Sequence, residues 1–148
     1  MPFVQWSPEF SIGIEEIDAE HKKLLEILNQ FHDAVEAGLG KDALSKVLDE
    51  LILYVGYHFS HEEELFFGAN YPGAERHRLL HRALTTTVTE IYDDFKKGGV
   101  DIMPLQVLNF LKNWLYEHIL GSDRAFGLYL AGQQHPACAK PQAAALQS

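Results

Sequence analysis

Along four stretches of this chain, apolar residues return at alternating steps of three and four, and this spacing constrains the fold more than any other feature. Such steps bring side chains to one face of an α-helix, whereas a half-buried strand needs strict alternation, which no segment shows. The stretches run from Asp18 to Gly38, from about Asp42 to Gly68, from His77 to Gly98, and from Pro104 to about Gly121, with a brief resumption to Leu130. Short connections favour antiparallel neighbours. The sequence therefore predicts an all-α fold, an up-down-up-down antiparallel four-helix bundle.

The two ends of the chain lack this periodicity. Residues 1–17 are rich in proline, glycine and aromatic residues, so we expect an extended N-terminal arm that packs on the bundle. Residues 132–148 are small, polar and interrupted by proline, which predicts a flexible C-terminal tail. A chain of 148 residues has the usual size of one domain. We therefore assign residues 1–131 to a single bundle domain that ends in a short C-terminal helix.

The composition excludes several classes of partner. The formal net charge is −9, and a negative field repels nucleic-acid phosphates and anionic lipid surfaces. No apolar run approaches the roughly 20 residues that cross a bilayer, so we expect no membrane insertion. The single cysteine, Cys138, and a start without a basic and apolar leader indicate a reducing, cytoplasmic location. Because one bundle uses up the apolar stripes, we expect a monomer.

Five of the eight histidines lie on the apolar stripes, namely His21, His58, His77, His81 and His118. Taken singly, each polar residue has an ordinary interpretation. A lone core histidine is common, Glu62 could belong to a solvated run of acids, and Asp123 could be a turn or cap residue. Taken together, these interpretations fail, because buried polar groups without partners cost several kcal/mol each. A metal centre would use the imidazoles and carboxylates as ligands.

The donor set indicates two metal ions. Five imidazoles and two carboxylates are too many for one tetrahedral zinc, but they suit two ions that share bridging carboxylates. Nitrogen and oxygen donors without thiolate favour iron or manganese over copper(I) or zinc. The paired Glu-x-x-His motifs of ferritin-like proteins are missing from the stripes, and His61-Glu62-Glu63-Glu64-Leu65 lacks the final histidine of a His-Glu-x-x-His motif.

The spacing of these motifs is similar to that of the hemerythrin family, in particular its single-domain bacterial members. The resemblance spans residues 6 to about 128 and rests on Trp6, Asp18-x-x-His21-Lys22, His58-Phe59-x-x-Glu62-Glu63, Tyr71-Pro72, His77-x-x-x-His81, Trp114-Leu115-x-x-His118-Ile119 and Asp123. One departure is Leu65 where many relatives have methionine, which leaves the expected ligands unchanged. The residues beyond Leu130 have no counterpart in the family pattern and are given no function.

The resemblance implies a non-haem diiron centre that binds dioxygen and has no enzyme activity. The ligands that it implies are His77, His81 and His118 for one iron, His21 and His58 for the other, and Glu62 and Asp123 as bridges, together with an oxo or hydroxo bridge. The second iron would then be one ligand short. Dioxygen would bind reversibly at this open position.

Large apolar residues near the histidines predict a dry pocket around the open position. They are Leu24, Phe59, Trp114, Leu115 and Ile119. Without a nearby acid or a water chain, protonation of bound oxygen should be slow, which favours reversible binding over turnover. An alternative for Leu24 and Leu115 is ordinary core packing.

The leading hypothesis is therefore storage, transport or delivery of dioxygen in a bacterial cell, with an oxygen-consuming enzyme as a partner. A second hypothesis is an oxygen or redox sensor, although the bundle leaves little chain for an output module. A third is a diiron redox enzyme that reduces peroxide or nitric oxide, or oxidises and stores iron. Of the other histidines, His32 lies three turns from His21, His61 could reach the site only by displacing Glu62, and His135 belongs to the tail.

Overall fold

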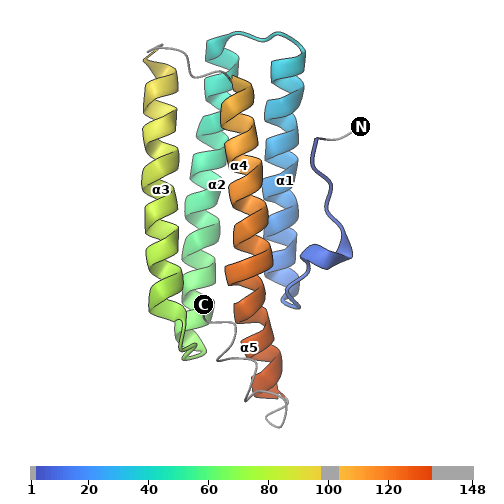
Figure 1. Ribbon diagram of the computed structural model, residues 1–148, viewed down its shortest axis with the longest axis vertical. Coiled ribbons are helices and arrows are strands. Elements are labelled where there is room, and N and C mark those ends of the chain that lie inside the picture. Colours follow the sequence, from blue (N-terminus) through green and yellow to red (C-terminus); the bar gives the residue numbers. More distant parts are fainter. Residues whose placement is uncertain (1–2, 98–103, 135–148) are drawn as a thin grey trace.

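The computed structural model describes residues 3–97 and 104–134, which form a bundle of four long helices. These are α1 (Glu15–Glu36), α2 (Lys41–Gly68), α3 (Ala74–Lys96) and α4 (Pro104–His118). Figure 1 shows them side by side in alternating directions; α1 packs on α2 and α4, and α2 packs on α3. The predicted antiparallel four-helix bundle is confirmed. None of the described helices is both long enough and apolar enough to cross a membrane.

The apolar stripes of the four helices meet in the centre of the bundle. Leu28 and Phe31 of α1 and Leu108 of α4 are at most 1% exposed. Complete burial of such a side chain contributes roughly 1.5–3 kcal/mol to stability. The histidines of the stripes lie near the lower end of the bundle as drawn in Figure 1, beneath this apolar part.

Two helices end at a residue in the left-handed backbone conformation. Gly38 follows α1 with a φ of 72°, and the amide after it donates to the carbonyl of Ala34 over 3.0 Å. Asn70 follows α2 with a φ of 54°, and the amide after it donates to the carbonyl of Phe66 over 3.0 Å. Both are Schellman-type ends, which satisfy free carbonyls and reverse the chain. The reversal at Asn70 brings the histidines of α3 opposite those of α2.

Near Gly121, where we expected the fourth helix to end and resume briefly to Leu130, α4 ends but the chain stays helical. A π-helical turn, Ile119–Asp123, follows α4 directly and leads into α5 (Arg124–Gln134). The amide of Arg124 donates to the carbonyl of Ile119, five residues back, so the backbone stays hydrogen-bonded across the glycine. Positions 132–134 of the predicted tail fall within α5. The rest of the predicted tail, with His135 and Cys138, lies outside the described residues.

Helix α1 begins one turn earlier than predicted, at Glu15 and not at Asp18. Asp18 instead anchors the N-terminal arm, because its carboxylate accepts hydrogen bonds from the Ile12 amide (2.9 Å) and the Ser11 hydroxyl (2.5 Å). The side chain that we expected to start the helix thus lies within its first turn. Negative charge at this position is favourable for the helix dipole.

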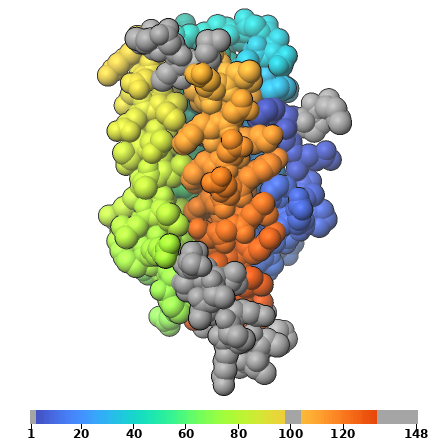
Figure 2. Space-filling view, viewed as in Figure 1, coloured from blue at the N-terminus to red at the C-terminus, as the bar shows by residue number. Residues whose placement is uncertain are grey.

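The N-terminal arm packs along the bundle, as expected. The backbone of Val4 exchanges two hydrogen bonds of 2.9 Å with the side chain of Asn29 on α1. Where the arm crosses α5, a Cβ at Gly127 would lie 2.1 Å from the carbonyl oxygen of Ile12, so glycine is required there. Figure 2 shows α4 at the front of the molecule, between α3 and the dark blue arm.

Candidate metal centre

A layer of ionisable side chains crosses the bundle, and every long helix contributes to it. Its members are His21 from α1, His58 and Glu62 from α2, His77 and His81 from α3, His118 from α4, and Asp123 from the π-helical turn. All of them are buried, and Glu62 and Asp123 are 0% exposed. The structure thus brings together all the residues that the sequence predicted to gather at a metal site.

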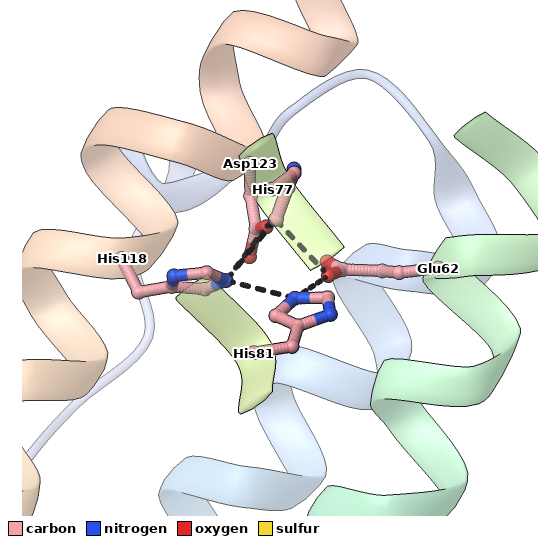
Figure 3. Close-up of side chains that lie close together, drawn as sticks. All are labelled: Glu62, His77, His81, His118 and Asp123. Carbon is pink, nitrogen blue, oxygen red and sulfur yellow. Dashed lines mark hydrogen bonds and ion pairs between the residues drawn. The ribbon is translucent and has the colours of Figure 1, made fainter. Parts of the chain in front are cut away.

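The donor atoms form two overlapping groups, each with its atoms within 4.8 Å of one another. The three-histidine group consists of Glu62, His77, His81, His118 and Asp123. The two-histidine group consists of His21, His58, Glu62 and Asp123. Figure 3 shows the first group, in which side chains from α2, α3, α4 and the π-helical turn point toward one another.

Each of the two shared carboxylates turns one oxygen toward each group. Glu62 places Oε1 3.0 Å from Nε2 of His81 and Oε2 3.3 Å from Nε2 of His58. Asp123 places Oδ1 2.9 Å from the nearest imidazole of the three-histidine group and Oδ2 2.9 Å from Nε2 of His21. A carboxylate that bridges two cations offers them one oxygen each, and both shared carboxylates have this orientation.

Several of these buried atoms lie close together without hydrogen bonds. Both oxygens of Glu62 and Asp123 and both ring nitrogens of His21 have no hydrogen-bond partner among the described residues. Buried polar atoms without partners are strongly destabilising. Yet Nε2 of His21 is only 2.9 Å from Oδ2 of Asp123, so these atoms converge on the same space. This arrangement fits metal ions, which would satisfy the lone pairs.

The electrostatics of the cluster favour a cation between the carboxylates. Burial lowers the pKa of His21, but contacts with Asp123 and Glu62 outweigh it and raise this pKa to about 9. Burial is likewise outweighed at His58, where Glu62 and Glu20 raise the pKa to about 10. Despite burial, the surrounding imidazoles hold the pKa of Glu62 and of Asp123 below the ordinary carboxyl range. Within the described chain, these two carboxylates form ion pairs with imidazoles alone.

The π-helical turn explains how His118 and Asp123 both reach the site. Five residues of a regular α-helix rotate by about 500°, which would leave the two side chains on different faces. In a π-helix, residues five apart lie above one another. Nε2 of His118 and Oδ1 of Asp123 are accordingly 3.2 Å apart. The local irregularity therefore places the second shared carboxylate.

Two further carboxylates, which sequence reasoning missed, contact the outer nitrogens of site histidines. Glu20 Oε1 is 2.7 Å from Nδ1 of His58, and Glu63 Oε2 is 2.8 Å from Nδ1 of His81. Such contacts orient a metal-binding imidazole and fix its tautomer. Glu20 carried a signal, because it continues the apolar stripe of α1 three residues after Ile17. Glu63 lies in a run of acids and carried none.

The other described histidines lie outside both donor groups. His61 contacts Glu20, and its Nε2 is 3.6 Å from Oε2 of Glu16, so it does not take the place of Glu62. The ring of His32 stacks on Phe3 with centroids 4.7 Å apart, well away from the site. Neither of them adds a donor to the cluster.

An apolar cavity adjoins the histidine layer. Besides Trp114, it is lined by Leu24, Val55, Leu84 and Leu115, and beyond them by Leu28, Leu51, Val88 and Leu111. Each of the first four lies three residues from a site histidine on its own helix. The cavity leaves about 10 Å³ for the centre of a water-sized molecule, which is enough for one.

The predicted pocket residues divide between this cavity and the histidine rings. Leu24, Trp114 and Leu115 line the cavity. Phe59 instead stacks on His81, with ring centroids 3.8 Å apart and planes at 5°. Ile119 is fully buried in the π-helical turn. Trp114 also stacks on the neighbouring imidazole of α4, at 5.1 Å and 18°.

Comparison with known proteins agrees with the family that the motifs indicated. Residues 12–128 match the model of a family described as the hemerythrin HHE cation binding domain. The chain belongs to the hemerythrin family. It is therefore a cation-binding protein, and its buried histidine and carboxylate cluster is consistent with a hemerythrin diiron site.

Relatives and solved structures cover most of this hemerythrin-family chain. A bacteriohemerythrin of Stenotrophomonas maltophilia is 34% identical over 126 residues, which are 85% of this chain and 80% of that protein. A bacteriohemerythrin of Clostridium acetobutylicum is 32% identical over 124 residues, or 82% of this chain and 96% of that one. A crystal structure of wild-type hemerythrin has a TM-score of 0.78 and 27% identity, and covers 84% of this chain and 95% of its own.

Proposed function

We propose that this protein binds two iron ions and takes up dioxygen reversibly, as a carrier that stores, transports or delivers oxygen in a bacterial cell and not as an enzyme. Two overlapping donor groups that share Glu62 and Asp123 are the observation that carries this proposal. His77, His81 and His118 would hold one ion, His21 and His58 the other, and Glu62 and Asp123 would bridge them. When bound, the iron pair supplies the electrons that dioxygen binding requires and regains them on release.

The difference of one histidine supports an open ligand position. With the shared carboxylates counted in each, the three-histidine group offers five ligands and the two-histidine group four. A bridging oxygen would raise these numbers to six and five. Nitrogen and oxygen ligands without thiolate suit iron, and open positions beside such ligands are where iron proteins bind oxygen. A small external ligand therefore has a place in the two-histidine group.

The apolar cavity supports dioxygen as that ligand and carriage as the function. Leu24 and Leu115 separate the histidine layer from the rest of the core, and no residue that lines the cavity is an acid. Water and proton donors are thereby kept away from this side of the site. Because proton transfer is needed for oxygen to leave in reduced form, this surrounding favours release of unchanged dioxygen over turnover.

The experiment that tests this function is an absorption spectrum of the iron-loaded, reduced protein, cycled between argon and air. We expect a nearly colourless reduced form, a visible charge-transfer band in air, and loss of that band under argon. His58→Ala is the control, because the band should depend on the two-histidine group. A permanent ferric spectrum after the first exposure would contradict reversible binding. A wild-type chain that takes up no iron would contradict the diiron site.

A further inference from the structure

Glu20 is a buried acid that the proposed metal site does not use. It is 6% exposed, and the only other buried acids among the described residues are Glu62 and Asp123. Its Oε1 is 2.7 Å from Nδ1 of His58, and its Oε2 contacts Nδ1 of His61. One carboxylate thus holds two imidazoles, one in the metal layer and one nearer the surface.

The contact with Glu20 fixes which nitrogen of His58 faces the site. At 2.7 Å, Oε1 of Glu20 lies within hydrogen-bonding distance of Nδ1 of His58. An ionised carboxylate only accepts hydrogen bonds, so Nδ1 of His58 carries the hydrogen. Nε2 is then the nitrogen of His58 that faces the site, 3.3 Å from Oε2 of Glu62, and it is the nitrogen that would bind a metal.

The two donor groups do not receive equal support at their outer nitrogens. In the three-histidine group, His81 contacts Glu63, which is 29% exposed. In the two-histidine group, Nδ1 of His21 has no hydrogen-bond partner among the described residues. Within the described chain, Glu20 is therefore the only side chain that orients an imidazole of the two-histidine group in this way.

We propose that Glu20 is a positioning residue that orients His58 and so controls how tightly the two-histidine group holds its metal. The contact with His61 holds Glu20 in place for this role. This inference rests on the proposed function, since it takes His58 as a ligand. His61 contacts Glu20 from the side nearer the surface and is 22% exposed. Without His61, the second oxygen of Glu20 would lose its partner and the carboxylate could turn away from His58.

The expected effects differ between the two metals. A carboxylate behind a ligand histidine typically contributes about 10- to 100-fold to metal affinity. We expect Glu20→Ala to weaken the second metal by about this factor and to leave the first almost unchanged. Glu20→Gln should recover part of the loss, because its amide oxygen still accepts from His58. His61→Ala should have a smaller effect, and His61→Gln should restore binding, because its amide can donate to Glu20.

The test is an anaerobic titration of the metal-free protein with cobalt(II), followed by absorption and proton NMR. Each imidazole bound through Nε2 should give one shifted Nδ1–H resonance, so the wild-type chain should show three at one equivalent and five at two. In Glu20→Ala, the first three should persist while the other two need about 10- to 100-fold more cobalt. Glu26→Ala is the matched control, because it removes an acid of α1 that is 62% exposed, and it should titrate as wild type.

The possible results separate this inference from the proposed function. Fewer than two cobalt ions in the wild type would contradict the proposed function and the inference with it. Two ions in the wild type, held with unchanged affinity in both Glu20→Ala and Glu20→Gln, would overturn the inference alone. Equal weakening of both ions would also overturn it, because Glu20 would then support the fold in general. Glu63→Ala should show the reverse pattern and weaken the three-histidine group.

Discussion

The three-histidine group and the two-histidine group share both carboxylates, but their imidazoles are held by different means. In the first group every imidazole stacks on an aromatic ring: His77 on Phe66 at 4.7 Å, His81 on Phe59 at 3.8 Å, and His118 on Trp114 at 5.1 Å. In the second, His21 and His58 meet edge to face at 4.8 Å, and a hydrogen bond to Glu20 orients one of them. Aromatic packing holds a ring firmly over a large area. Each group thus has one imidazole that contacts a carboxylate through its outer nitrogen, but of the imidazoles in the two groups, aromatic rings of the described residues stack only on those of the three-histidine group.

This difference fits the division of roles that we propose. A metal held by three packed imidazoles, two carboxylates and a bridging oxygen would have six ligands and a fixed surrounding. A metal with one imidazole fewer would keep a position for an external ligand. Changes in shared residues should therefore affect both metals, and changes in one group should affect its own metal most.

The largest effect is expected where both groups depend on one local feature, the π-helical turn. Inserting one alanine after Gly121 would rotate Asp123 by about 100° around the helix axis, away from His118. We expect iron per chain to fall from two to well below one, as in Asp123→Ala, when measured by elemental analysis. Gly121→Ala is the control, because a Cβ there meets no atom within 4 Å, and it should keep both irons. Full iron in the insertion variant would show that the turn does not position Asp123.

The next largest effect is expected from removing one histidine of each group. His118→Ala should lose the iron of its own group, loosen the other, and lower the free energy of unfolding, because metal binding is coupled to folding. His58→Ala should lose one iron and keep the three-histidine group occupied. Iron analysis and denaturant unfolding of the loaded proteins measure both effects. Full iron content in His118→Ala would remove this residue from the ligand set.

A smaller effect is expected from pH, and it should separate metal-free from metal-loaded protein. Without metal, the pKa is about 9 for His21 and about 10 for His58, against an ordinary value of 6.5. A raised pKa stabilises the fold fully below pH 6.5, and this stabilisation is lost as pH rises to about 10. The free energy of unfolding of metal-free protein should fall across this window. Bound metal replaces these protons, so the free energy of unfolding of loaded protein should change less with pH. Equal pH dependence of the two forms would contradict the assignment of His21 and His58 as metal ligands.

The smallest effect on the metals is expected from the cavity. Leu24→Ala should keep both irons, but the oxygenated form should oxidise irreversibly several-fold faster, because water gains access beside the histidine layer. Leu28→Ala is the matched control, since it lines the same cavity one layer further away and is equally buried at 1%. Each variant should lose about 2–5 kcal/mol of stability. If the visible band decays in Leu24→Ala as slowly as in the control, these residues serve packing alone.

The helices and the gathering of the site residues could be predicted, because both follow from positions on one helical face. Apolar spacing predicted the second helix from about Asp42 to Gly68, and the structure has Lys41–Gly68. His81 and Leu84 lie one turn apart on a single stripe, so a histidine on that stripe must face the core. Four such stripes meeting in one bundle bring their polar members together.

The features that could not be predicted depend on contacts between segments. Gly121 indicated the end of a helix. The π-helical turn is required only because His118 and Asp123 contact one another, and this contact depends on the fold. Phe59 follows His58 directly, but one residue turns about 100° around the helix, so its ring reaches His81 on α3 and not the cavity. The sequence predicted a helix start at Asp18 and not its contact with the arm, because the arm has no periodic pattern of its own.

The most direct measurement of the proposed asymmetry is a crystal structure of the anaerobically iron-loaded protein, with anomalous diffraction recorded at the iron edge. We expect two iron peaks bridged by Glu62 and Asp123. One should be bound by three imidazoles, and the other by His21 and His58 alone, with its open position free of protein ligands. A single iron peak, or two irons with equal numbers of histidine ligands, would contradict this arrangement.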